Sequence, residues 1–177
     1  YEKKNLIAPM VKVYKRLTHL DYDPTYYQKI LLHTTNAANK TRWTLASLSA
    51  AIENKDWQSA QQVAQTALET TQDPIPILCQ LETVYTKWHD HELNNLWSQL
   101  GSAYLRTDQI DLAEKTYRKA FEKFQTLELA LSLGETLLKQ DKKEESMRVY
   151  YDASILALLS DNLESLDLCL RNILQID

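Results

Sequence analysis

The chain has 177 residues, of which 44% are hydrophobic and 25% are charged, proportions that suit one folded domain and argue against disorder. It contains only two glycines. Because hairpins and tight turns need glycine for positive φ angles, an all-β fold is disfavoured. The abundant Leu, Ala, Gln, Glu and Lys are strong helix formers, so the composition predicts an all-α protein.

The net charge of −4 gives no indication of a nucleic-acid-binding surface. Residues 1–40 hold seven Lys/Arg and three Asp/Glu, whereas residues 41–177 hold 13 and 21. A basic leading segment can steer a charged partner, but solvated helix faces are the preferred interpretation. No apolar run approaches about 20 residues, so we expect no membrane-spanning segment.

The first predicted helix covers residues 6–18, after Asn5 as a possible cap. Asp23 followed by Pro24 indicates the start of a second helix, since proline is tolerated in the first turn. Apolar residues at helical spacing predict further helices at 42–53, 57–70, 77–88, 94–106, 109–123, 127–139, 143–157 and 161–174. The short connections favour antiparallel neighbours, and no segment alternates strongly enough to predict a strand.

Three segments share one spacing, in which a small residue is followed by a core residue four positions later and by an alanine three positions after that. These trios are Ala60/Ala64/Ala67, Ala113/Tyr117/Ala120 and Ser146/Tyr150/Ala153. The last two trios are 33 residues apart. Upstream of the second trio, Trp97, Leu100, Gly101 and Tyr104 follow the pattern W-x-x-L-G-x-x-Y. Self-similarity at such a period indicates a repeat architecture.

This pattern resembles the tetratricopeptide repeat (TPR), a 34-residue helix–turn–helix unit. The resemblance implies an α-solenoid, a right-handed superhelical stack of antiparallel helix pairs. In it Gly101 and Gly134 allow close approach of the paired helix. The implied divisions are 1–40 (N-terminal cap or divergent repeat), 41–74 (divergent repeat), 75–93 (extra helix), 94–159 (two repeats) and 160–177 (capping helix). The chain departs from the pattern at Leu48, which stands where the first helix of a repeat has glycine, and in the interval of 53 residues from Ala60 to Ala113.

Members of this family bind extended peptides or helices in a concave groove lined by the first helix of each pair. Carried over by position, the resemblance implies groove residues on the two better copies and, in the divergent copy, Arg42, Leu45 and Ser49. The groove residues of the better copies are Asn95, Ser98, Ser102, Leu105 and Arg106, then Leu131, Glu135, Leu138 and Lys139. Ser98, Ser102, Leu131 and Glu135 occupy positions where chaperone-binding members carry basic or amide residues. Capture of a C-terminal carboxylate is therefore not expected.

No catalytic or cofactor motif is present, so we expect neither enzyme activity nor a cofactor. Phosphate-binding loops need several glycines close together, and the chain has only two glycines in all. His89 and His91 are interpreted as a solvated helix end and not as a metal site, because alternate residues on a helix point apart. Cys79 and Cys169 lie in apolar contexts and are predicted to be buried free thiols, with a disulfide between them as the alternative. Trp97 is assigned to the core, and Trp88 is the candidate for an exposed anchor.

We therefore expect a protein-interaction scaffold or adaptor that binds a partner peptide or helix. The alternative is a regulatory or ligand-sensing module of a larger signalling or transcription-regulating chain. RNA binding is disfavoured because the repeat region is acidic and its aromatic residues occupy core positions. The sequence begins with Tyr1, so we expect a fragment, and reduced cysteines favour a cytoplasmic location.

Overall fold

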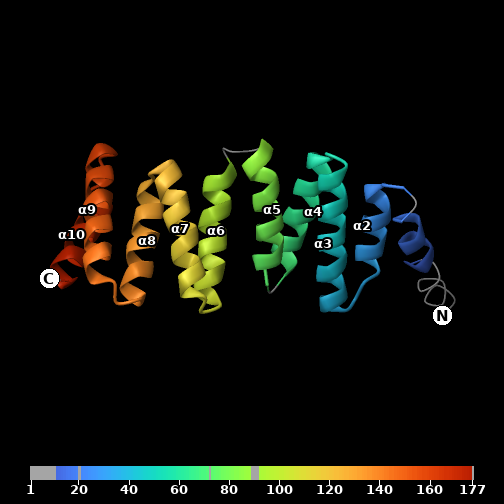
Figure 1. The fold of residues 1–177 in the computed structure, drawn as a ribbon, viewed down its shortest axis with the longest axis horizontal. Helices are drawn as coiled ribbons and strands as arrows, with labels where there is room; N and C mark the ends of the chain where they lie inside the picture. The colour runs from blue at the N-terminus through green and yellow to red at the C-terminus, as the bar shows by residue number, and fades with distance from the viewer. Residues whose placement is uncertain (1–10, 20, 72, 89–91, 177) are drawn as a thin grey trace. The chain divides into compact units, whose positions relative to one another are not determined.

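The computed structural model describes residues 11–19, 21–71, 73–88 and 92–176, and within these ranges it is all-helical with no strand (Figure 1). Residues 11–17 are helical and precede nine labelled helices. These are α2 (Pro24–Leu32), α3 (Ala37–Glu53), α4 (Trp57–Thr70), α5 (Ile75–Trp88), α6 (Leu93–Arg106), α7 (Ile110–Phe124), α8 (Leu127–Lys139), α9 (Lys143–Leu159) and α10 (Leu163–Ile176). The predicted all-α class is confirmed for this part of the chain.

Polar caps determine where several helices begin. The side chain of Asp23 accepts a hydrogen bond from the Thr25 N–H at 2.8 Å, so α2 begins at Pro24 as predicted. The prediction for α3 was too short, since Asn36 caps the helix and α3 begins at Ala37, five residues before the predicted start. The segment between Asn36 and Arg42 contains only small and polar residues, so hydrophobic periodicity gives no signal there. The predicted residues 6–10 lie outside the described ranges.

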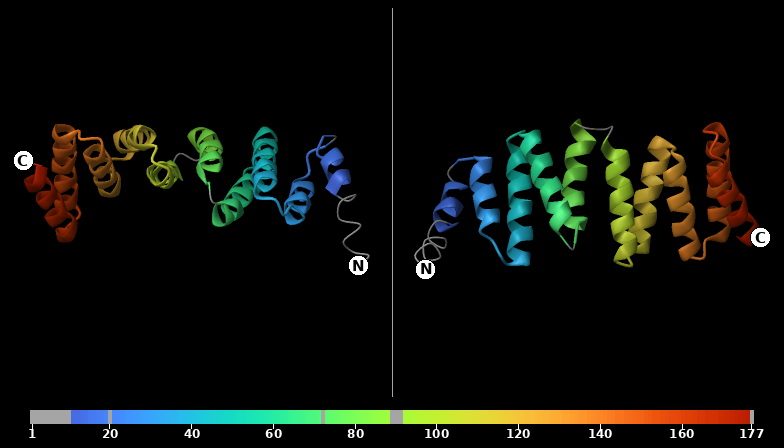
Figure 2. Two further views of the ribbon diagram at one scale, coloured as in Figure 1. Left: turned by 90° about the horizontal axis from the view of Figure 1, so that it is seen from below. Right: turned by 180° about the vertical axis from the view of Figure 1, so that it is seen from behind.

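The chain divides into two compact units, residues 1–87 and residues 88–177. In unit 1, α3 packs against α2 and α4. In unit 2, α7 packs against α6 and α8, and α9 packs against α8 and α10. The two views of Figure 2 show α6 to α10 side by side in chain order. The finer boundaries inferred from the repeat pattern remain predictions.

Both glycines lie under a tyrosine ring of the following helix. A Cβ atom added at Gly101 would lie 2.5 Å from Cζ of Tyr117, and one at Gly134 would lie 2.8 Å from Cζ of Tyr150. Both rings are buried, so neither is free to swing into solvent. Each glycine therefore gives the tyrosine ring of α7 or α9 room against α6 or α8, and the expected close approach is confirmed.

The α3–α4 pair fills the corresponding positions with the opposite sizes. Gly101 and Tyr117 are 16 residues apart, and so are Gly134 and Tyr150. In α3 and α4 the same separation joins Leu48 and Ala64, and both of these are buried. A large residue on the first helix is thus matched by a small one on the second. An exchange of volumes of this kind would allow α3 to carry a leucine where α6 and α8 carry glycine.

The turns that follow α3, α6, α8 and α9 share one backbone conformation. Lys55, Asp108, Asp141 and Asp161 all have positive φ angles, between 54° and 59°. The next residue in each turn donates its N–H five residues back, as Gln109 does to Tyr104 O at 2.9 Å and Lys142 to Leu137 O at 3.0 Å. This is the hydrogen bond of the Schellman helix end, in which glycine normally takes the left-handed position.

The prediction of two buried thiols is right for one cysteine. Cys169 is fully buried in α10, but Cys79 is exposed. Leu78 and Leu81 are on the buried side of α5, and residue 79 projects about 100° around the helix from Leu78, away from both. Trp97 is 2% exposed, as its core assignment predicts. None of the described helices is both long and apolar enough to cross a membrane.

Candidate partner-binding surface

The predicted groove residues of α6 lie along one line of that helix. Asn95, Ser102 and Arg106 are exposed, while Ser98 is half-buried. Asn95 accepts a hydrogen bond from Gln99 at 3.1 Å. Arg106 is in the last turn of α6, where a cation also favours the negative end of the helix dipole. The helix thus presents a polar, hydrogen-bonding face with a positive charge at its C-terminal end.

The corresponding face of α8 is mixed. Glu135 and Lys139 are exposed, and Lys139 again lies in the last turn. Leu131 and Leu138 are half-buried because they pack against the core cluster that contains Tyr150. The two leucines therefore serve the core of unit 2, and the charged residues provide the accessible chemistry of this face.

A hydrogen bond connects the two faces. Ser98 of α6 donates to Oε1 of Glu128 in α8 at 3.2 Å, although α7 separates these helices in the sequence. We call the surface formed by Asn95, Ser102, Arg106, Glu135 and Lys139 the α6–α8 face. The predicted Leu105 is half-buried on α6, and the remaining predicted residues, Arg42, Leu45 and Ser49, are on α3 in unit 1.

Sequence reasoning missed an apolar groove on another side of unit 2. The groove has a volume of about 590 Å³ and runs between α7 and α9, where Phe121, Ile155, Leu156 and Leu159 line it. Glu122 and Asp152 are also in the lining and give it an acidic border. Ile155 and Leu159 are 56% and 80% exposed. They are four residues apart and lie outside the repeat positions of α9, and this spacing was the sequence signal that could have indicated the groove.

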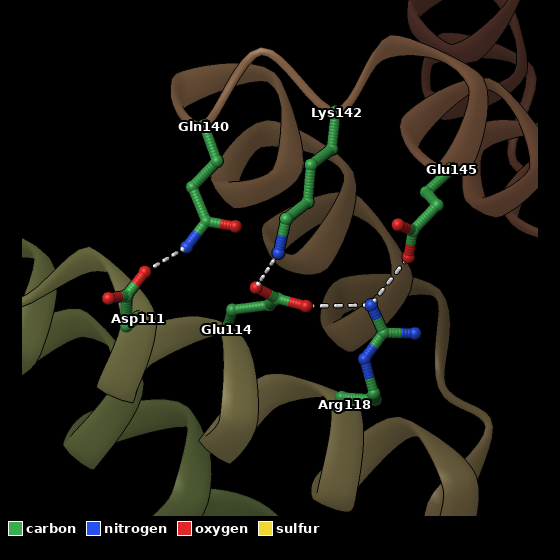
Figure 3. Close-up of polar contacts among 6 residues, drawn as sticks. All are labelled: Asp111, Glu114, Arg118, Gln140, Lys142 and Glu145. Carbon is green, nitrogen blue, oxygen red and sulfur yellow. Dashed lines mark hydrogen bonds and ion pairs between the residues drawn. The ribbon is translucent and has the colours of Figure 1, made fainter.

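A buried carboxylate joins α7 to the turn before α9 (Figure 3). Glu114 is 9% exposed, and its two oxygens accept hydrogen bonds from Arg118 at 2.7 Å and from Lys142 at 2.6 Å. Arg118 also bonds to Glu145 of α9 at 2.9 Å, and Gln140 to Asp111 at 2.9 Å. We call these six residues the Glu114 network.

The pKa of Glu114 shows that the network compensates for burial. Burial alone would raise the pKa of this carboxyl, but the hydrogen bonds and positive charges of Lys142 and Arg118 outweigh it. The net result is a pKa below the usual value of 4.5. In Figure 3, Lys142 contacts Glu114 from the turn before α9, and Arg118 bridges Glu114 of its own helix to Glu145 of α9. The network therefore joins α7 to the start of α9 through a buried, charge-compensated contact.

Unit 1 contains a cavity of its own. About 350 Å³ lies among α2, α3 and α4, lined by apolar Leu31, Leu32 and Val63 and by polar Lys40 and Gln62. No group of three or more potential metal ligands occurs within the described residues. The predicted anchor Trp88 and the His89–His91 pair cannot be placed, because the Trp88 side chain and residues 89–91 lie outside the described part.

Comparisons with known proteins assign no family. A scan against protein-family models found no match, and a search of curated proteins found no relative. The resemblance to the tetratricopeptide repeat therefore rests on the residues themselves.

Proposed function

We propose that this chain is a protein-interaction scaffold that binds a peptide or helix of another protein on the α6–α8 face. The Ser98–Glu128 hydrogen bond supports this proposal most directly, because it brings two non-consecutive helices together into one surface. That surface offers amide, hydroxyl, carboxylate and cationic groups to a main chain or polar side chains. A solenoid of tetratricopeptide-like pairs fits the recurrence of the Gly–Tyr contact after 33 residues.

The test compares capture by three forms of the immobilised chain from a lysate of its source. One form is unaltered, one carries Asn95→Ala, Arg106→Ala and Lys139→Ala, and a control carries Lys115→Ala and Arg148→Ala. Like the triple variant, the control removes two positive charges, but it removes them from exposed positions of α7 and α9. We expect a protein that the unaltered and control forms retain and the triple variant loses. Equal retention by all three forms contradicts binding on the α6–α8 face.

Ligand sensing is the second candidate function, and the cavity of unit 1 favours it. Its volume of about 350 Å³ is within the usual range for small-molecule sites. A Val63→Trp substitution would fill this space. A small molecule that raises the melting temperature of the unaltered chain, but not that of the Val63→Trp variant, would support sensing. A ligand that stabilises both equally does not bind there.

A further inference from the structure

Helix α10 carries a second apolar stripe in addition to the one that it buries. Cys169 and Ile173 face the core of unit 2, whereas Leu163, Leu170 and Leu174 are 68%, 47% and 77% exposed. The exposed leucines are separated by seven and four residues, which places them in one line along the helix. No helix of the described residues covers these three leucines, so the stripe is an unpartnered apolar surface of unit 2.

We propose that this stripe pairs with the stripe of a second copy of the chain, α10 against α10, antiparallel about a two-fold axis. The spacing of the leucines is self-complementary in that arrangement. With the axis between residues 168 and 169, Leu163 is level with Leu174 of the second copy. The two Leu170 side chains are then offset by three residues, about 4.5 Å along the helices, so that they interdigitate. A two-fold interface requires such self-complementarity.

The charges beside the stripe fit the same register. Asp167 and Arg171 form an i,i+4 ion pair at 2.5 Å and remain 59% and 70% exposed. An axis between residues 168 and 169 places Arg171 level with residue 166 of the second copy, one residue from its Asp167. By symmetry, Asp167 of the first copy lies equally close to Arg171 of the second. A foreign helix of one charge sign would face a like charge from either Asp167 or Arg171. A second copy presents both charges in the matching order, and this favours it as the occupant.

The neighbouring helix enlarges the available apolar surface. A stable dimer generally buries at least about 1,200 Å² in total, more than one stripe of three leucines provides. Helix α9 packs against α10 and exposes Tyr151 and Leu158 by 52% and 60%. In the proposed dimer these side chains extend the apolar contact from α10 onto α9.

Sedimentation velocity of the full chain over a range of concentrations tests the proposal. The unaltered chain should sediment as a concentration-dependent dimer. Arg171→Asp alone and Asp167→Arg alone should each weaken dimerisation by about tenfold or more, because like charges then meet across the axis. A mixture of the two variants should recover a heterodimer, since each supplies the charge that the other has lost. Recovery on mixing separates a symmetric interface from a loss of folding.

A leucine series provides the second arm. Leu163→Ser with Leu174→Ser should leave the chain monomeric, whereas Leu112→Ser, at a leucine of α7 that is 40% exposed, should leave the dimer intact. Circular dichroism of each variant verifies that the helices persist. A chain that is monomeric at every concentration overturns the proposal. A dimer that survives both the charge and the leucine variants overturns it as well.

Discussion

Two tyrosines at equivalent positions differ in what their hydroxyl groups contact. The hydroxyl of Tyr150 is buried and has no hydrogen-bond partner among the described residues. Burial raises the pKa of Tyr150 to about 12, and the nearby Glu135 and Cys169 add to this effect. Burial also raises the pKa of Tyr117, but a hydrogen bond with Ser132 acts in the opposite direction. Both tyrosine rings pack on a glycine, but the hydroxyl of Tyr117 in α7 has a hydrogen-bond partner and that of Tyr150 in α9 has none among the described residues.

Removing the two hydroxyls should have opposite effects on stability. Tyr150→Phe is expected to raise the free energy of unfolding by about 1 kcal/mol, because an unpaired buried polar group is lost. Tyr117→Phe is the matched control and should lower it by about 1 kcal/mol, because Ser132 loses its partner. Urea unfolding measures both variants. A Tyr150→Phe variant that is as destabilised as Tyr117→Phe would show that the Tyr150 hydroxyl is hydrogen-bonded.

Helix pairing depends on the volumes placed at the contact between α6 and α7. Gly101→Ala should destabilise the chain by about 1–2 kcal/mol, since a clash with the Tyr117 ring exceeds the gain in helix propensity. Gly101→Leu combined with Tyr117→Ala reproduces the Leu48–Ala64 arrangement. We expect the double variant to be more stable than the two single changes predict together. Thermal unfolding of the four forms gives the coupling, and strict additivity would exclude compensation.

The Glu114 network makes the docking of α7 on the α8–α9 turn dependent on pH. The folded pKa of Glu114 is below 4.5, so its contribution to stability is present above pH 4.5 and is lost as pH falls through the folded value. Glu114→Gln should cost about 1–2 kcal/mol at pH 7, a modest figure because Arg118 and Lys142 are each 40% exposed.

That cost should shrink as the pH is lowered. Urea unfolding at pH 7 and pH 3 is expected to show the two forms converging at the lower value. Ser146→Ala, which removes the buried hydrogen bond that Ser146 donates to Gly134 O at 2.8 Å and involves no ionisable group, serves as the control and should cost the same at both pH values. A constant difference between wild type and Glu114→Gln across this range would contradict the assignment.

Helix prediction succeeded where neighbours in the sequence are neighbours in the structure. Periodic apolar residues predicted α4, α6 and α8 closely, and the two glycines predicted the close approach of consecutive helices, although not the tyrosine rings that fill these contacts. The α7–α9 groove was missed because it is formed by two helices that are not consecutive. The exposure of Cys79 was missed because an apolar sequence context does not specify which side of a helix is covered. The α6–α8 face as a binding site stays a prediction.

The division into two units predicts that the second folds alone. Its buried contacts, including the cluster of Ala130, Tyr150, Ala153, Cys169 and Ile173, lie within residues 88–177. A fragment of residues 92–177 should be helical by circular dichroism and should unfold cooperatively in urea. A shorter fragment that begins at residue 110 lacks α6, leaves Tyr117 uncovered and should not unfold cooperatively. A disordered 92–177 fragment would contradict the prediction.

The reversed volumes of the helix pairs bear on how the chain avoids misassembly during synthesis. Chains of similar helix pairs risk trapping one helix with the wrong mate. If α7 docked on α3, Tyr117 would meet Leu48 and the contact would be overfilled. If α4 docked on α6, Ala64 would face Gly101 and leave a void. Each wrong pairing would then carry a steric mismatch, so a leucine at position 48 in place of glycine would help the helices to recognise their own partners.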